Sequence, residues 1–362
     1  AGSLLNNSGV DVRAGATWDL NGNNDQVSYV RDDPGFAGGS VLLGGATLTV
    51  DNSGTFSRTF SGVISEAGNV VKAGGFTWSL TGNNTYTGTT TISDGVLRID
   101  GNDNLGNGGL IFDNGTLDID GSFLNTRSIT INSGGTAGFH IANFQTLNQA
   151  NTISGDSTTT LVLSHNGTFQ TSSNHAATFA GDIHIMRGTY DMGGGGDGLS
   201  NNTTVTVDEP GTFIVNNPDD IGGLAGAGDV LLNQTLRVGH DNASTEFSGV
   251  ISGTGLFGKR GAGTVTLSGI NTYTGDTDID GGTLRLSGSG RLANTSDVDI
   301  AAGAMFDVND VTDTIGAVSG AGDVTLGTGS ANTLTLGSGN GSGAHTGNIS
   351  GTGNIVKIGS GT

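Results

Sequence analysis

A gapless internal repeat is the feature that most limits how this chain can fold. Residues 60–100 (FSGVISEAGNVVKAGGFTWSLTGNNTYTGTTTISDGVLRID) align with residues 247–287 (FSGVISGTGLFGKRGAGTVTLSGINTYTGDTDIDGGTLRLS) at an offset of 187, with 22 identities in 41 positions. A third copy starts at Ile349 and matches residues 251–264 at 9 of 14 positions. Self-similarity of this kind is typical of proteins built from stacked repeats. Because the third copy stops at Thr362, in mid-repeat, we expect the sequence to be a fragment of a longer polypeptide.

Shorter motifs divide the chain into superunits of about 96 residues. Their starts lie near residues 10, 129, 205 and 298, so three units and part of a fourth fill residues 1–362. No stretch between them has the Pro-rich or charge-rich composition of a linker, and we therefore predict one continuous domain. Residues 121–204 form a degenerate unit, for which we predict a protruding loop near residues 192–202.

Within each unit the apolar residues alternate with polar ones at a period of two. Runs such as Thr47–Val50, Thr264–Leu267 and Thr333–Leu336 last only a few residues and are broken by Gly or Asn-Gly. Such runs predict short strands with one buried face, and 68 Gly residues supply the turns between them. Propeller blades would need their own signature dipeptides, and a sandwich would not repeat its sequence. The pattern therefore predicts an all-β solenoid, a single elongated rod of stacked parallel coils with short loops.

The charge of the chain excludes several classes of function. Thirty-three acidic and 13 basic residues give a net charge of −20, which disfavours binding to nucleic acid and to anionic membranes. No apolar run reaches the roughly 18 residues of a membrane-spanning helix. Cysteine is absent, so disulfides and thiolate metal sites are excluded.

The repeat itself resembles a known family. The pattern K-x-G-x-G-T-[LV]-T-L-S-G-x-N-T-Y-T-G-x-T-x-[IV]-x-x-G-x-L is almost intact at residues 259–284. Residues 72–97 carry it with departures at Phe76, Trp78 and Asn83-Asn84, and residues 357–362 hold its opening. It is similar to the autotransporter-associated β-strand repeat of bacterial passenger domains, which are exported by type V secretion.

That resemblance implies a right-handed parallel β-helix on the outer surface of a Gram-negative cell. It also implies anchorage through a C-terminal outer-membrane β-barrel that lies outside this sequence. Passengers of this kind include adhesins, aggregation factors and enzymes, so the resemblance does not define one activity. The family repeat has no catalytic residues to transfer to this chain.

The residues give no assembled catalytic motif. Gly155-Asp156-Ser157 approaches the serine-protease sequence, but Thr158 follows where Gly is needed. A carbohydrate-active β-helix would need two carboxyl groups about 5–10 Å apart in a groove. Asp113 with Asp118, and Asp219 with Asp220, are the candidates for this alternative, in which the protein is a polysaccharide lyase or glycoside hydrolase.

Metal and cofactor motifs are incomplete. Residues 19–23 (DLNGN) begin like an EF-hand loop but lack its later Gly and Glu, and residues 193–199 (GGGGDGL) occur only once. The six histidines are not spaced as metal ligands. We expect no cofactor and no dedicated metal site, beyond adventitious calcium at the surface.

The degenerate unit is the most promising region for recognition. Phe144, Arg187 and Tyr190 lie in it and are our candidate contact residues, because aromatic and Arg side chains dominate binding hot spots. We predict no catalytic, cofactor-binding or metal residues. The predicted function is that of a non-enzymatic stalk or adhesin, whose partner is a host matrix protein, a glycan or another copy of the chain.

Overall fold

The structure is a computed structural model, and it describes residue 4 and residues 8–33, 35–172, 178–193, 198–330 and 332–362. The chain separates into two compact units, residues 1–181 (unit 1) and residues 182–362 (unit 2). The described residues form short strands and two three-residue 3₁₀ helices, and they contain no α-helix. None of the helices among them is long and apolar enough to cross a membrane.

Unit 1 contains the first 21 strands and one 3₁₀ helix. Their bounds are β1 Gly9–Asp11, β2 Thr17–Asp19, β3 Asp25–Val27, β4 Tyr29–Arg31, β5 Ser40–Leu42, β6 Thr47–Asp51, β7 Ser57–Phe60, β8 Val63–Ser65, β9 Asn69–Ala73, β10 Thr77–Leu80, β11 Thr90–Ile92, β12 Val96–Ile99, η1 Asn102–Asn104, β13 Leu110–Phe112, β14 Thr116–Ile119, β15 Phe123–Asn125, β16 Ile129–Ile131, β17 Thr136–Ile141, β18 Thr146–Gln149, β19 Ile153–Ser154, β20 Thr160–Leu163 and β21 Thr168–Thr171.

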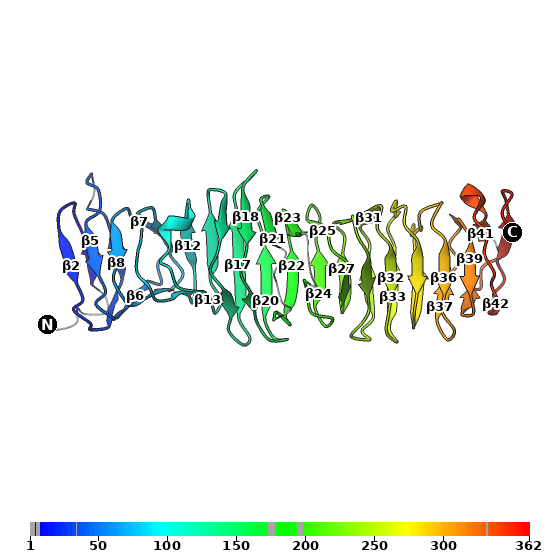
Figure 1. Cartoon of the computed structure of the whole chain (residues 1–362), viewed down its shortest axis with the longest axis horizontal. Coiled ribbons are helices and arrows are strands. Elements are labelled where there is room, and N and C mark those ends of the chain that lie inside the picture. The colour runs from blue at the N-terminus through cyan, green and yellow to red at the C-terminus, as the bar shows by residue number, and fades with distance from the viewer. Residues whose placement is uncertain (1–3, 5–7, 34, 173–177, 194–197, 331) are drawn as a thin grey trace. The chain divides into compact units, whose positions relative to one another are not determined.

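These strands stack into parallel sheets. One runs in the order β7-β10-β12-β14-β17-β20, a second in the order β3-β6-β9-β11-β13-β16-β19, and shorter ones are β2-β5-β8, β15-β18-β21 and β1-β4. Every pairing between strands is parallel, and the partner residues of neighbouring strands lie about 20 residues apart, as in the series Arg58, Trp78, Leu97 and Leu117. Each turn of the chain therefore lies directly on the previous one, which defines a parallel β-helix (Figure 1).

Unit 2 contains the remaining strands and the second 3₁₀ helix. Their bounds are β22 Asp182–Ile185, β23 Thr189–Met192, β24 Thr204–Val207, β25 Thr212–Val215, β26 Asp219–Ile221, β27 Gly223–Gly226, β28 Asp229–Leu232, β29 Leu236–Val238, β30 Thr245–Phe247, β31 Val250–Gly253, β32 Phe257–Lys259, β33 Thr264–Leu267, β34 Thr277–Ile279, β35 Thr283–Leu286, β36 Val298–Ile300, β37 Met305–Asp307, β38 Asp313–Ile315, β39 Val318–Gly320, β40 Asp323–Thr325, β41 Thr333–Leu336, η2 Ser338–Asn340, β42 Ile349–Ser350 and β43 Asn354–Lys357.

Unit 2 is a parallel β-helix of the same kind. Its sheets run in the orders β22-β24-β27-β30-β33-β35-β37-β40-β42, β23-β25-β28-β31, β26-β29-β32-β34-β36-β39 and β38-β41-β43. The predicted fold class, an all-β solenoid of parallel strands, is confirmed. The prediction of one continuous domain with superunits of about 96 residues stays a prediction.

The core of each coil follows from the period of two in the sequence. In unit 1 a column of inward side chains, Trp78, Leu97, Leu117, Phe139 and Leu163, is at most 2% exposed. Phe139 also lies 5.2 Å from Phe112 and 4.9 Å from Phe169, measured between ring centroids. The Thr residues between inward positions point outward, as the alternation predicts. A column of this kind buries each inward side chain against two others, so short strands with few apolar residues suffice.

Candidate functional site

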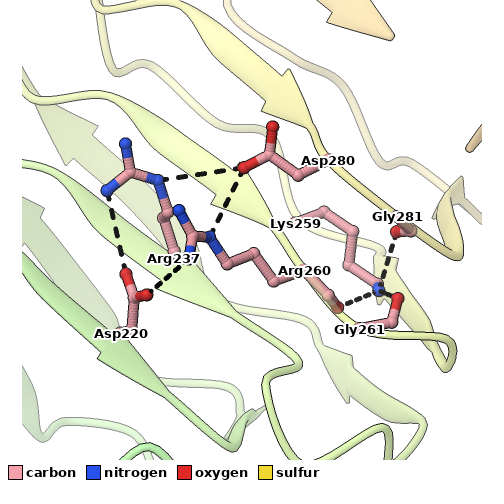
Figure 2. A network of polar contacts seen from close by, with 7 residues as sticks. All are labelled: Asp220, Arg237, Lys259, Arg260, Gly261, Asp280 and Gly281. Atoms are coloured by element: carbon pink, nitrogen blue, oxygen red, sulfur yellow. Dashed lines mark hydrogen bonds and ion pairs between the residues drawn. The ribbon is translucent and has the colours of Figure 1, made fainter. Parts of the chain in front are cut away.

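The lysine of the repeat is buried and donates hydrogen bonds to main-chain carbonyl groups. Lys259, the last residue of β32, is 0% exposed. Its Nζ donates to the carbonyl oxygen of Arg260, to that of Gly261 at 2.9 Å and to that of Gly281, one coil further on, at 3.1 Å. Figure 2 shows the ammonium group directed into this ring of oxygens. We call this arrangement a lysine–carbonyl site.

The other copy of the repeat holds the same arrangement in unit 1. Nζ of Lys72, on β9, donates to the carbonyl oxygens of Ala73 at 3.1 Å, Gly74 at 2.6 Å and Asp94 at 3.0 Å. Asp94 lies 22 residues after Lys72, as Gly281 does after Lys259, so both sites join two consecutive coils. The short loop that follows each lysine turns its carbonyl groups inward, and the ammonium group satisfies them.

Burial lowers the pKa of both lysines to about 8, and nearby carboxylates oppose this shift. The opposing carboxylates are those of Asp94 and Asp51 for Lys72, and that of Asp241 for Lys259. At neutral pH the ammonium form therefore still dominates, and it supplies the three donors that the carbonyl groups require.

An asparagine of the repeat connects three coils. The side-chain oxygen of Asn84 accepts from the amide of Ile64 at 2.7 Å, and its side-chain nitrogen donates to the carbonyl of Asn104 at 2.5 Å. Each partner lies 20 residues away, in opposite directions along the chain. The side chain therefore hydrogen-bonds to the coil before it and to the coil after it.

Asn271 makes the equivalent contacts in unit 2. It accepts from the amide of Ile251 at 3.0 Å and donates to the carbonyl of Arg291 at 2.8 Å. Because both copies bridge the same three levels, the Asn of the N-T-Y-T segment sets the register of consecutive coils.

The tyrosine and threonine of the repeat form a buried pair. The hydroxyls of Tyr86 and Thr90 lie 2.5 Å apart, and those of Tyr273 and Thr277 lie 2.6 Å apart. In unit 2 the pair extends to Ser296 of the next coil, 2.9 Å from Thr277. Burial raises the pKa of Tyr273, so the phenol stays protonated and can act as donor. The residue types that define the repeat are therefore those that hydrogen-bond within and between coils.

A square of four charges lies beside the lysine–carbonyl site of unit 2 (Figure 2). Asp220 accepts an ion pair from Arg260 at 2.9 Å and lies 3.7 Å from Arg237. Asp280 lies 3.4 Å from Arg260 and 4.0 Å from Arg237. The sites of Asp220, Arg237, Arg260 and Asp280 thus connect four successive coils, and the corresponding positions at an offset of 187 lack both arginines and the second carboxylate.

The carboxylates considered for the enzyme alternative are engaged with other side chains. Asp118 pairs with Arg98 at 2.6 Å, and Asp220 belongs to the charged square. Asp113 accepts from the amide of Asn132 at 2.6 Å, and Asp219 is 3% exposed. These contacts stack carboxylates with residues of neighbouring coils and do not support a hydrolytic pair.

The three candidate contact residues lie in different environments. Phe144 is 97% exposed in unit 1, in a turn where its φ is +65°. Arg187 is exposed in unit 2, between β22 and β23. Tyr190 is 2% exposed and its ring packs 6.1 Å from that of Phe213, so its assignment to a contact surface was wrong. Its place in the alternation, an inward position of β23, already indicated a core residue.

The predicted loop near residues 192–202 is only partly described. Residues 194–197 lie outside the described residues, while Met192 and Leu199 on either side are 1% and 2% exposed. In the described parts of the chain, no three His, Asp or Glu side chains gather closely enough to hold a metal ion. The absence of a cofactor stays a prediction.

Two arrangements were missed from the sequence. One is the charged square, whose arginines belong to neighbouring coils and whose spacing of about 20 residues was the available signal. The other is a cation–aromatic cluster around Arg58, which joins residues of separate coils. Neither could be recognised before the length of a coil was known.

Comparison with known proteins agrees with the structure. The model of the passenger-associated-transport-repeat matches residues 70–99 and 257–286, which contain the lysine, asparagine and tyrosine described above. The adhesin BmaC autotransporter of Brucella suis biovar 1 (strain 1330) is 32% identical over 365 residues, covering 88% of this chain. The chain spans about 10% of the length of that relative. No solved structure matches this chain.

A parallel β-helix stabilised by these transport repeats is the architecture of an exported passenger domain. The chain belongs to the autotransporter passenger family. Its location is accordingly the outer surface of the cell, attached to the outer membrane.

Proposed function

We propose that this segment is a non-enzymatic, adhesive part of an autotransporter passenger. The observation that carries the proposal is the 32% identity to an autotransporter adhesin over 88% of the chain. Its partner on this proposal is a host matrix protein, a glycan or a second copy of the chain. The autotransporter relationship also implies an outer-membrane translocator domain as its anchor.

The placement of polar side chains supports a binding scaffold. In both units the polar residues of the repeat hydrogen-bond between coils, which makes the β-helix rigid at the positions where it repeats. Side chains that do not repeat are then free to differ along the outer surface. Residues on rigid scaffolds bind with little loss of conformational entropy, which suits an adhesive surface.

Phe144 supports the proposal from one side chain. A bulky residue with φ near +65° is uncommon, because its Cβ crowds the main chain. Strained positions of this kind cluster at binding and active sites. The strain here holds a fully exposed aromatic ring at the tip of a turn, where a partner can cover it.

A binding assay with two matched variants tests the proposal. The purified segment is incubated with immobilised matrix proteins, with glycans and with itself, and sugar release is followed in the same wells. Saturable binding without product is expected. Phe144→Asn is expected to weaken binding about tenfold, the loss of one aromatic anchor. The control is Ile270→Asn, because Ile270 is also an exposed apolar residue, at 57%, but in unit 2.

Two results would contradict the proposal. Release of sugar products by the parent chain would show an enzyme, and the stacked carboxylates would then be the residues to substitute. Absence of binding to every surface, including the chain itself, would remove the adhesive role and leave a passive stalk.

A further inference from the structure

One arginine in unit 1 is held between two aromatic rings. The guanidinium carbon of Arg58, on β7, lies 4.1 Å from the ring centroid of Phe56 and 5.2 Å from that of Tyr29. Its Nη1 donates to the carbonyl oxygen of Ser57 at 3.0 Å. Among the described residues, no carboxylate lies within ion-pair distance of this side chain. The stacking fixes the guanidinium, while its charge is left without a partner of opposite sign.

A neighbouring arginine makes the same ring more positive. Arg31 lies 5.1 Å from the centroid of Tyr29 and is neutralised by Asp11, 2.7 Å away. A hydrogen bond from Arg31 lowers the pKa of the Asp11 carboxyl, and the charge of Arg58 lowers it further. Asp11 is thus already satisfied by Arg31. We call Tyr29, Arg31, Phe56 and Arg58 the Arg58 patch; it carries an excess of positive charge in a chain of net charge −20.

The fold does not require this patch. At the offset of 187, Ser57-Arg58-Thr59-Phe60 corresponds to Ser244-Thr245-Glu246-Phe247, and Phe56 corresponds to Ala243. Phe60 and Phe247 are both 0% exposed, so the inward side of the coil is the same in the two copies. Only the outward side differs. The repeat therefore forms its coil equally well with a threonine in place of Arg58.

Unit 2 presents the opposite charge. Asp276, Asp278 and Asp299 lie on or beside the adjacent strands β34 and β36, where Asp278 and Asp299 are register partners. None of the three takes part in an ion pair in the described part of the chain. Burial raises the pKa of Asp278, and repulsion from Asp280, Asp299 and Asp276 adds to it. We call Asp276, Asp278 and Asp299 the acidic face; it is short of cations, as the Arg58 patch is short of anions.

We propose that the Arg58 patch of one copy binds the acidic face of a second copy. The inference rests on the proposed function and names its partner, a second copy of this chain. A guanidinium fork matches a carboxylate in geometry, and its stacking between two rings removes the entropy that an exposed arginine would lose on binding. Two different surfaces meet, so the contact is heterologous and joins copies in series. At an ionic strength of 0.15 M the Debye length is about 8 Å, which limits the repulsion between the two acidic chains to their closest parts.

Sedimentation velocity at 0.15 M salt tests the inference over concentrations of about 1–100 µM, where weak self-association is measurable. The parent chain is expected to associate as its concentration rises. Arg58→Gln is expected to raise the dissociation constant at least about tenfold, as for a desolvated charge pair that loses one member. Arg291→Gln is the matched control, since Arg291 also donates to a main-chain carbonyl, that of Gly290, and lies outside both surfaces.

A charge exchange makes the test specific. Arg58→Asp alone and Asp299→Arg alone are each expected to lose association, while an equimolar mixture of the two recovers pairs through the exchanged charges. Trp78 is the register partner of Arg58, so unchanged Trp78 fluorescence shows that the coil is intact in the variants.

Three outcomes would overturn the inference. They are a parent chain that stays monomeric throughout, an Arg58→Gln variant that associates like the parent, and a mixture that does not recover. Saturable binding of heparin that Arg58→Gln abolishes and that leaves self-association unchanged would assign the patch to an acidic glycan instead. Each of these outcomes is separate from the matrix and glycan assay of Phe144→Asn, so the adhesive function can stand if this contact fails.

Discussion

The lysine–carbonyl site of unit 1 can be removed with little change in volume. In Lys72→Met the methionine side chain fills nearly the same space but donates no hydrogen bond. The carbonyl oxygens of Ala73, Gly74 and Asp94 then lose their common donor. The ring of Phe76 also loses a cation 4.1 Å from its centroid. If the lysine joins the two coils, unit 1 should lose stability in this variant.

The size of the loss follows from opposing contributions. A buried carbonyl without a partner costs about 1–3 kcal/mol, and three are affected. The cation–aromatic contact adds about 1 kcal/mol. Relief of the buried charge acts in the opposite direction: a pKa lowered from 10.5 to about 8 corresponds to about 3 kcal/mol. The balance is a decrease of about 3 kcal/mol in the free energy of unfolding.

Urea unfolding followed by tryptophan fluorescence measures this loss. Both tryptophans, Trp18 and Trp78, lie in unit 1, and the buried indole nitrogen of Trp78 donates to the carbonyl of Val30 at 2.9 Å. With a denaturant slope of about 3 kcal/mol per molar urea, the midpoint should fall by about 1 M. Lys259→Met, which removes the same site from unit 2, is the control and should change this fluorescence transition less. A midpoint for Lys72→Met within about 0.2 M of the parent would refute the reasoning, since it would show that water satisfies the three carbonyl groups.

Two further predictions concern buried groups of unit 2. Burial raises the pKa of Asp313 from 3.8 to about 6; the folded chain therefore holds a proton that the unfolded chain releases, and this group's contribution to stability is full below about pH 4 and falls by about 3 kcal/mol as the pH rises to 6. Urea midpoints followed by circular dichroism at pH 4 and pH 7 should differ less in Asp313→Asn than in the parent, and an identical pH dependence in the two proteins would contradict this. Tyr273→Phe removes a hydroxyl that lies 2.6 Å from that of Thr277 and should lower the free energy of unfolding by about 1–2 kcal/mol. Thermal unfolding measures this loss, with the equivalent Tyr86→Phe in unit 1 as its matched comparison; no change in either variant would show that the pair is not stabilising.

The class of fold could be predicted because its determinants are local and repeated. An alternation of period two, broken by Gly at short intervals, defines strands of three to six residues with one inward face, as in Thr264–Leu267. Repetition at an offset of 187 then requires that similar segments occupy equivalent places in the stack. The same local pattern placed Tyr190 inward, and selecting it for its residue type alone led to the wrong assignment.

The polar contacts could not be predicted in the same way. The letters K, N and Y of the repeat were visible, but their roles depend on which residue lies one coil away. Lys259 reaches the carbonyl of Gly281, and Asn271 reaches Ile251 and Arg291, only because a coil takes about 20 residues to return. That length is set by turns whose conformations the sequence pattern does not specify.

The amino-acid sequence by itself therefore determined the all-β class, the repeated coil and the passenger family, since alternation, glycine punctuation and a long motif are properties of adjacent residues. Only the tertiary structure decided which charges are neutralised. Arg260 is paired with Asp220, 40 residues before it, while Arg58 is stacked between rings and has no carboxylate partner among the described residues. The physical reason is that Coulomb and stacking energies depend on distances in space, and in a β-helix those distances are set by the stacking of coils.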